Sequence, residues 1–259
     1  MRLLFIRHGD PDYVHDSLTE KGVKEASLLA DFSDKMNIGI CYQSPFGRAK
    51  KTASYTLERL GKDVTTFDWL HEFEPELDLN KAPADLVAAY PDAFKKEDGT
   101  FVNRICWDIL PSYLYKHPEL LSLDGYKTSD VAKYSKLNEV SDYVLSNFDA
   151  LLASFGYERD GLIYRVKKEC RETLVFYCHY GVTCLIMAHL LNTSPFVMWN
   201  GMAMAPTSVC EFHTEEREEG IAWFRASKVG DISHLSIGGE EPSFAARFCE
   251  VYSDFSQRH

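Results

Sequence analysis

The chain opens with Met1-Arg-Leu-Leu-Phe-Ile-Arg-His-Gly-Asp10, and this stretch decides how the rest of the sequence is interpreted. Residues Leu3–Ile6 form an unbroken apolar run of the length that one buried strand requires. The run stops abruptly at Arg7, His8 and Gly9. Because ligands bind beyond the carboxyl ends of the strands in open α/β sheets, we expect these residues to line a binding site.

The composition limits the classes of protein to consider. The chain has 259 residues, of which 45% are hydrophobic, enough to form a large core. Its formal net charge of −11 argues against nucleic acid or an anionic membrane as a partner. No stretch approaches the ~20 apolar residues of a membrane helix, and the opening run is too short for a signal peptide. Seven cysteines without a C-x-x-C pair are typical of a reducing compartment, so we expect a cytoplasmic protein.

Strand-like apolar runs alternate with segments of helical periodicity along the chain. Ser17 and Glu20 have the spacing of a capping box, which predicts that a helix opens there. The other expected elements are strands at 3–6, 38–42, 64–69, 162–166 and 173–178, a hairpin of 208–213 with 221–227, and helices at 46–60, 137–155, 182–191 and 244–252. This alternation predicts an α/β fold in three layers, with a mostly parallel central sheet and helices on both faces. We expect one domain over 1–259, with an irregular insertion or lid of short helices at about 75–135.

Four features of the sequence require a common explanation. The strand at 173–178 ends like the first one, with a histidine close to a glycine, His179 and Gly181. Arg48 lies in the first turn of a predicted helix, where the helix dipole disfavours a cation. Glu72 follows the third predicted strand. In a parallel sheet these positions meet at one edge, so the sequence predicts one site that contains His8, Arg48, Glu72 and His179.

These residue types are suited to phosphoryl transfer. Arginine donates paired hydrogen bonds to phosphate oxygens and stays charged, so Arg7 and Arg48 are candidate phosphate ligands. A neutral imidazole nitrogen of His8 can attack phosphorus, and a backbone carbonyl is expected to hold the other nitrogen. A carboxylic acid on a loop can protonate the leaving oxygen. Tyr13 and Trp107 are weaker candidates for the walls of the pocket.

The motifs resemble those of the histidine phosphatase superfamily, also called the phosphoglycerate mutase-like family. The matching stretches are Leu4–Gly9, Ser17–Gly22, Ser44–Ala53, Leu70–Glu72 and Cys178–Gly181. The resemblance implies that His8 is the phosphorylated nucleophile and Glu72 the proton donor. It also implies that Arg7, Arg48 and His179 bind the phosphate, and that neither a metal nor a cofactor is required.

Two departures from the family pattern leave alternatives open. Asp10-Pro11 stands where the family usually has Glu-Thr, and residues 73–76 replace a Gly-x-Trp-Glu-Gly run, so Glu74 is an alternative acid. The leading interpretation is a metal-independent phosphatase that acts on a small phosphorylated metabolite. A phosphoglycerate mutase-type transferase and a non-catalytic binder of phospho-ligands or phosphoproteins are the alternatives. The sequence leaves a homodimer open.

Overall fold

The computed structural model describes residues 1–91, 93–243, 251–254 and 256, and within it the chain divides into two compact units. The first unit comprises Met1–Glu72, Phe155–Thr183 and Ala203–His259, and the second comprises Phe73–Ser154 and Cys184–Met202. The second unit therefore contains the predicted insertion and extends beyond it. The helix expected at 244–252 falls mostly on residues outside the described ranges.

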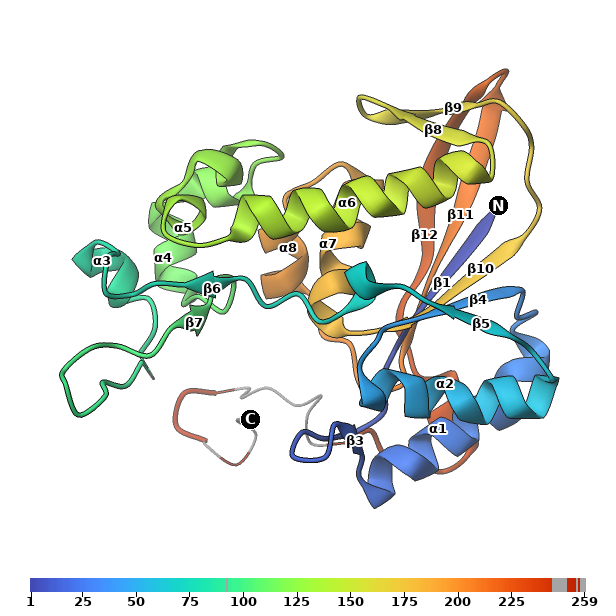
Figure 1. Cartoon of the computed structure of the whole chain (residues 1–259), viewed down its shortest axis with the longest axis horizontal. Coiled ribbons are helices and arrows are strands. Elements are labelled where there is room, and N and C mark those ends of the chain that lie inside the picture. The colour runs from blue at the N-terminus through green and yellow to red at the C-terminus, as the bar shows by residue number, and fades with distance from the viewer. Residues whose placement is uncertain (92, 244–250, 255, 257–259) are drawn as a thin grey trace. The chain divides into compact units, whose positions relative to one another are not determined.

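The first unit is built on an eight-stranded sheet with the order β5-β4-β10-β1-β11-β12-β9-β8 (Figure 1). The first four strands in this order are parallel, and the remaining four continue the sheet in antiparallel fashion. The predicted α/β fold with a central sheet and helices is confirmed. The strands are β1 (Arg2–Arg7), β4 (Ile40–Gln43), β5 (Val64–Thr66), β8 (Tyr157–Asp160), β9 (Ile163–Val166), β10 (Thr173–Cys178), β11 (Val209–Glu218) and β12 (Ile221–Asp231).

Alternation along β1 divides the core of this unit into two faces. Leu4 and Ile6 point into a cluster with Leu29 of α1 (Glu20–Phe32) and with Ala53 and Leu57 of α2 (Gly47–Leu60). Figure 1 shows these two helices side by side against the sheet, and contacts between them confirm that they pack together. The short helix α9 (Ser233–Ile237) also contacts α1.

The opposite face of the same strands is aromatic. The ring of Phe5 stacks on Phe176 with centroids 4.9 Å apart, and Phe212 meets Phe5 edge to face at 6.1 Å. Tyr42 of β4 stacks on the other side of Phe176 at 5.3 Å. Since β1 and β10 are central and buried on both faces, their carboxyl ends are held firmly in place, and both ends carry the histidines.

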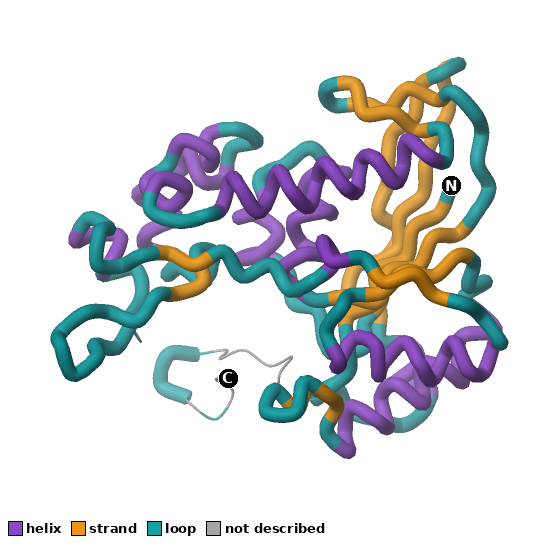
Figure 2. Tube along the Cα trace, viewed as in Figure 1, coloured by secondary structure: helices purple, strands orange, loops and turns teal. Residues whose placement is uncertain are grey.

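The second unit consists mainly of helices and loops (Figure 2). Its rings form a stack in which Trp199 lies between Phe73, at 5.2 Å, and Trp107, at 5.8 Å. In the described ranges, the structure contains no helix with the length and apolar character needed to cross a membrane. The elements of this unit are α3 (Ala84–Val87), α4 (Pro111–Lys116), α5 (Asp130–Lys133), α6 (Leu137–Ser154), α8 (Pro195–Gly201), β6 (Glu76–Leu77) and β7 (Arg104–Ile105), and α7 (Tyr180–Leu191) begins in the first unit and continues into this one.

The structure corrects the predicted start of the first helix. Ser17 is not its N-cap, because Ser17 belongs to β3 (Ser17–Leu18), which pairs with β2 (Pro11–Asp12). The N-cap is Thr19, whose hydroxyl accepts a hydrogen bond from the N–H of Gly22 at 3.0 Å. Thr19 also donates its own N–H to the Asp10 carbonyl. The helix therefore starts two residues later than the capping box predicts, and it is tied directly to the loop after Gly9.

Candidate active site

His8 follows β1 directly, and hydrogen bonds from the backbone of His8 and of Gly9 hold it in place. Its N–H donates to the carbonyl of Cys178, the last residue of β10. The N–H of Gly9 donates to the hydroxyl of Thr52 on α2 at 2.9 Å. A side chain at Gly9 would lie 2.8 Å from the carbonyl oxygen of Gly22, so only glycine fits this close approach of the loop to α1.

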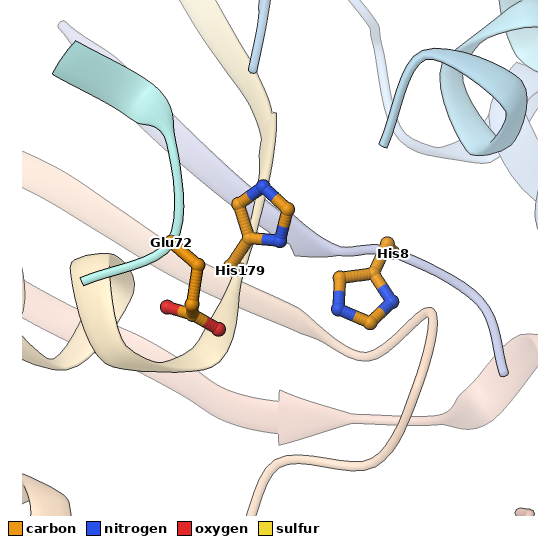
Figure 3. Close-up of side chains that lie close together, drawn as sticks. All are labelled: His8, Glu72 and His179. Atoms are coloured by element: carbon orange, nitrogen blue, oxygen red, sulfur yellow. The ribbon is translucent and has the colours of Figure 1, made fainter. Parts of the chain in front are cut away.

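The protonation state of His8 follows from one hydrogen bond. Its Nδ1 lies 2.7 Å from the Gly9 carbonyl oxygen, which can only accept, so Nδ1 carries the proton. Burial, with the charge of Arg7 and then of Arg48, lowers the pKa of His8 to about 3. The ring is therefore neutral at physiological pH, and its Nε2 keeps a free lone pair. Figure 3 shows one ring nitrogen turned toward Glu72 and His179.

His179 lies beside His8, with ring centroids 5.1 Å apart. Its Nε2 is 2.7 Å from the hydroxyl of Ser44, which also accepts the N–H of Phe46. Its Nδ1 is buried and has no hydrogen-bond partner among the described residues. Burial lowers the pKa of His179 well below its ordinary value, and a positively charged neighbourhood acts in the same direction. When the Ser44 hydroxyl donates its proton to Nε2, Nδ1 carries the ring proton and can donate it to an oxygen of an incoming anion.

Arg48 lies in the first turn of α2, as predicted, and its side chain is buried. Its guanidinium lies over the ring of Phe46 at 4.8 Å and over the exposed ring of Tyr13 at 5.4 Å. One terminal nitrogen pairs with Asp16 at 2.9 Å. The Nε of Arg48 is buried without a hydrogen-bond partner among the described residues, so the fork keeps donor capacity for a phosphate oxygen.

Arg7 is the last residue of β1, and its side chain contacts residues at both ends of the segment 180–204. Its guanidinium donates to the carbonyl of Met204 and lies over the ring of Tyr180 at 5.8 Å. The charge of Arg7 also lowers the pKa of both His8 and His179. Both arginines lower the pKa of His8, so the potential around its ring is positive and favours an anion.

Glu72 follows the short 3₁₀ helix η2 (Asp68–Leu70) and reaches the start of α7. Its Oε1 accepts the N–H groups of Gly181, at 2.9 Å, and Val182, at 3.4 Å. The N-terminus of a helix stabilises a carboxylate by its dipole and its unpaired N–H groups. Figure 3 shows the carboxylate directed to the side of the site where His179 and His8 lie.

The three side chains in Figure 3 form one compact cluster. Potential ligand atoms of His8, Glu72 and His179 all lie within 4.8 Å of one another. These distances would also suit a metal ion held by two imidazoles and a carboxylate. The neighbouring guanidinium groups, however, disfavour a second positive charge at the same point. The arrangement is therefore better suited to an anion with several oxygens.

Two of the sequence candidates lie in the other compact unit. Trp107 is partly buried, donates its indole N–H to the Phe73 carbonyl at 2.9 Å and stacks on Trp199. Glu74 is exposed and belongs to that unit too. The cluster of the first unit thus contains Glu72 and does not include Glu74.

The structure also adds residues whose roles the sequence did not reveal. Asp16 pairs with Arg48 and accepts the N–H of Gly47 at 2.5 Å, Ser44 contacts His179, and Thr52 holds Gly9. Ser44 and Thr52 lie in the motif stretch Ser44–Ala53, so their positions were a signal without an assigned role. Asp16 gave no signal of its own, because its partners come from a helix that starts 31 residues later.

Comparisons with known proteins agree with the fold and with the resemblance to the family. The family model of the histidine phosphatase superfamily (branch 1) matches residues 3–103. This range contains the stretch that ends in Arg7 and His8, the helix start with Arg48, and Glu72. No curated protein matches the sequence at the significance required.

Solved structures of phosphatases share the fold at low sequence identity. A phosphoserine phosphatase from Entamoeba histolytica in complex with phosphoserine is 16% identical, with a TM-score of 0.53, over 90% of this chain and 98% of that one. The mycobacterial glucosyl-3-phosphoglycerate phosphatase with inorganic phosphate is 19% identical, with a TM-score of 0.54 over 90% and 98%. The α-ribazole phosphatase from Shigella flexneri is 16% identical, with a TM-score of 0.51 over 90% and 97%.

The fold, the motifs and the family match point in one direction. The parallel strands end in two histidines, as the sequence predicts, and the solved structures extend the likeness in fold over most of the chain. The resemblance of this chain to the histidine phosphatase superfamily, branch 1, is thereby confirmed, with the family match covering residues 3–103.

Proposed function

We propose that the protein is a phosphatase that hydrolyses a small phosphomonoester through a phosphohistidine on His8, with Glu72 as the general acid and base. One observation carries this proposal. The Gly9 carbonyl fixes the proton of His8 on Nδ1, and the low pKa keeps Nε2 unprotonated beside Glu72, His179 and two arginines. A neutral nitrogen nucleophile in a positive environment is what attack on a phosphate dianion requires.

The two chemical steps can be assigned to this chain's own groups. In the first, the Nε2 lone pair forms the N–P bond, the ester P–O bond breaks, and protonated Glu72 gives its proton to the leaving oxygen. In the second, Glu72 takes a proton from water, the water oxygen bonds to phosphorus, and the N–P bond breaks to release phosphate. Arg7, Arg48 and His179 donate hydrogen bonds to the non-bridging oxygens, on which charge accumulates in both transition states.

The substrate that we propose is a small phosphorylated metabolite. In support, structures with the same fold are named as a phosphoserine phosphatase, a glucosyl-3-phosphoglycerate phosphatase and an α-ribazole phosphatase. The proposed chemistry is independent of metal, because two guanidinium groups and the imidazole of His179 supply the positive charge and the donors. Because the chain as a whole has a formal net charge of −11, we expect the positive charge that attracts an anionic substrate to be confined to this site.

The test is turnover of a generic aryl phosphate in the presence of EDTA, with His8→Ala as the paired variant. We expect chelator-resistant release of phosphate, which His8→Ala abolishes. Tight binding of inorganic phosphate without turnover would favour a binding protein. Transfer of phosphate between 2- and 3-phosphoglycerate would favour a mutase. Activity that EDTA removes would contradict the metal-independent mechanism.

A further inference from the structure

A buried carboxylate, Glu25, lies beneath the candidate site and takes no part in the reaction proposed above. It belongs to the middle of α1, and its side chain has no exposed surface. A carboxylate away from water is costly unless hydrogen bonds replace its hydration. The position is therefore one at which an apolar residue would be the less costly choice for packing alone.

Both oxygens of Glu25 accept hydrogen bonds from the backbone. Oε2 accepts the N–H of Asp10 at 2.9 Å, and Oε1 accepts the N–H of Ser243 at 3.1 Å. These donors come from segments 15 residues before and 218 residues after Glu25. The contacts are thus specific to the folded chain, and one of them reaches the loop that holds His8.

The first of these bonds continues directly to the nucleophile. The Asp10 N–H and the Gly9 carbonyl belong to the same peptide group, and the Gly9 carbonyl accepts the proton of His8 Nδ1 at 2.7 Å. A single planar peptide unit therefore has Glu25 bound at its N–H and His8 bound at its oxygen. A negative charge at the N–H end polarises the peptide and makes its oxygen a stronger acceptor.

We propose that Glu25 is a positioning residue for His8, which acts through the Gly9–Asp10 peptide to fix the Nδ1–H tautomer and to raise the electron density on Nε2. The inference rests on the proposed function in taking His8 as the nucleophile. It is the backbone counterpart of the carboxylate that orients the ring in catalytic histidine–carboxylate pairs. Glu25 itself does not touch the substrate.

The surroundings of Glu25 make this coupling sensitive to pH. Burial raises the pKa of Glu25 to about 7, and the Asp10 carboxylate acts in the same direction. The N–H groups of Asp10 and Ser243 oppose this shift, as does Lys21, which itself pairs with Glu240. Since the pKa of His8 is near 3, a change in the His8 ring around neutral pH reports a different group.

The test follows the His8 ring and the Asp10 amide by NMR in uniformly ¹⁵N-labelled protein, from about pH 5 to about pH 9, with His8→Asn to assign the ring signals. In the wild-type protein we expect the Nδ1 and Nε2 shifts of His8 to change with a midpoint near that of Glu25, and the Asp10 amide signal to change at the same midpoint. Glu25→Gln should lose this change. Glu20→Gln, the same substitution at an exposed position of α1, should keep it.

Two results would overturn the proposal. One is a His8 ring whose shifts stay constant through neutral pH, or change at a midpoint different from that of the Asp10 amide. The other is persistence of the change in Glu25→Gln. The wild-type measurement stands even where the variant does not fold. No turnover is needed, so the result is independent of whether the protein is a phosphatase.

A kinetic arm separates positioning from general loss of structure. Removing the hydrogen-bond partner that orients a metal-ligating histidine typically costs on the order of 10- to 100-fold in affinity or activity, and we take the same scale for His8. We expect Glu25→Gln to lower kcat by this amount with KM nearly unchanged, because Arg7 and Arg48 are untouched. A variant that raises KM and leaves kcat at the level of Glu20→Gln would contradict a role acting on the nucleophile.

Discussion

At the scale of single residues, the chemistry of His8 depends on a backbone carbonyl, as the sequence predicts, and the structure identifies it as that of Gly9. The motif around Arg7, His8 and Arg48 was enough to predict which side chains meet, and the structure gathers them with Glu72 and His179. The roles of Glu25 and Asp16 could not be predicted. Their partners are backbone N–H groups of distant segments, which the sequence does not show. From sequence alone, a glutamate on a helix is expected to be exposed to solvent.

Glu72→Gln tests the assignment of the proton donor. The amide keeps the shape of the side chain but cannot protonate a leaving oxygen. We expect hydrolysis of alkyl phosphates to slow by about 10²- to 10⁴-fold, the usual contribution of a general acid. Aryl phosphates should slow far less, since their leaving oxygen needs no proton. The comparison uses kcat/KM on both ester classes, because kcat/KM reports formation of the phosphohistidine, whereas the later hydrolysis of this intermediate is common to both classes.

Glu74→Gln is the matched control, because Glu74 is an exposed glutamate two positions along the same segment. Its rates on both ester classes should stay close to those of the wild-type protein. A selective loss on alkyl esters in Glu74→Gln instead of Glu72→Gln would transfer the role of the acid to Glu74. Equal losses of kcat/KM on alkyl and aryl esters in Glu72→Gln would show that Glu72 is not the general acid.

At the scale of elements, hydrophobic patterns located the buried strands and the long helices, while polar contacts decided where these elements begin and end. The strand β8 was not predicted because it contains Glu158, Arg159 and Asp160, which resemble a solvated loop. The arms of the β11–β12 hairpin extend through charged residues for the same reason. Backbone pairing stabilises these exposed segments, and periodicity does not report it.

The start of helix α2 allows a test of how a polar contact from a distant residue stabilises a helix end. Its N-cap residue, Phe46, supplies no side-chain hydrogen bond. Asp16 replaces it by accepting the N–H of Gly47 at 2.5 Å and of Arg48 at 3.4 Å. Asp16→Ala should therefore lower the free energy of unfolding by about 1 kcal/mol, the usual cost of a lost cap. Denaturant unfolding curves measure the change.

Asp16→Asn separates the cap from the charge. It keeps an acceptor oxygen, and asparagine tolerates the left-handed backbone of Asp16, with φ of 44°, better than alanine does. We expect it to recover most of the stability lost in Asp16→Ala. Since Asp16 is about half exposed, its ion pair with Arg48 adds little to stability. Equal stability of all three proteins would contradict the capping role.

At the scale of the whole molecule, the sequence predicts one domain over 1–259 with an insertion at about 75–135, and this stays a prediction. The contacts group the chain into two compact units, and the second of them is larger than the predicted insertion. The boundary falls inside α7, between Thr183 and Cys184. The sequence of α7 carries no signal for this boundary, because the helix is largely apolar and its residues are buried both before and after the boundary. Composition alone therefore cannot locate it.

The acid response of the fold gives a prediction at this scale. His234 is buried, and its Nε2 lies 2.8 Å from the Thr207 hydroxyl. Burial lowers the pKa of His234 to about 4, below the ordinary value of 6.5. The folded state thus binds this proton less readily than the unfolded state, so stability is present above about pH 6.5 and is lost as the pH falls toward 4.

His234→Gln should flatten this dependence. The wild-type protein should lose about 1.4 kcal/mol of stability more per pH unit than the variant within that window. The comparison uses the difference between two proteins, because Glu25, with a raised pKa, acts in the opposite direction in both. Parallel curves for wild type and His234→Gln would contradict a buried neutral histidine.

The most direct test of a phosphohistidine intermediate on His8 is to trap the phosphorylated enzyme. Rapid quenching at high pH during turnover of an aryl phosphate, followed by peptide mass spectrometry, locates the phosphoryl group. We predict an acid-labile phosphoramidate on His8 that accumulates in Glu72→Gln, because its hydrolysis needs the carboxylate as a base. Turnover without any phosphopeptide, or a phosphoryl group on a residue other than His8, would contradict the account.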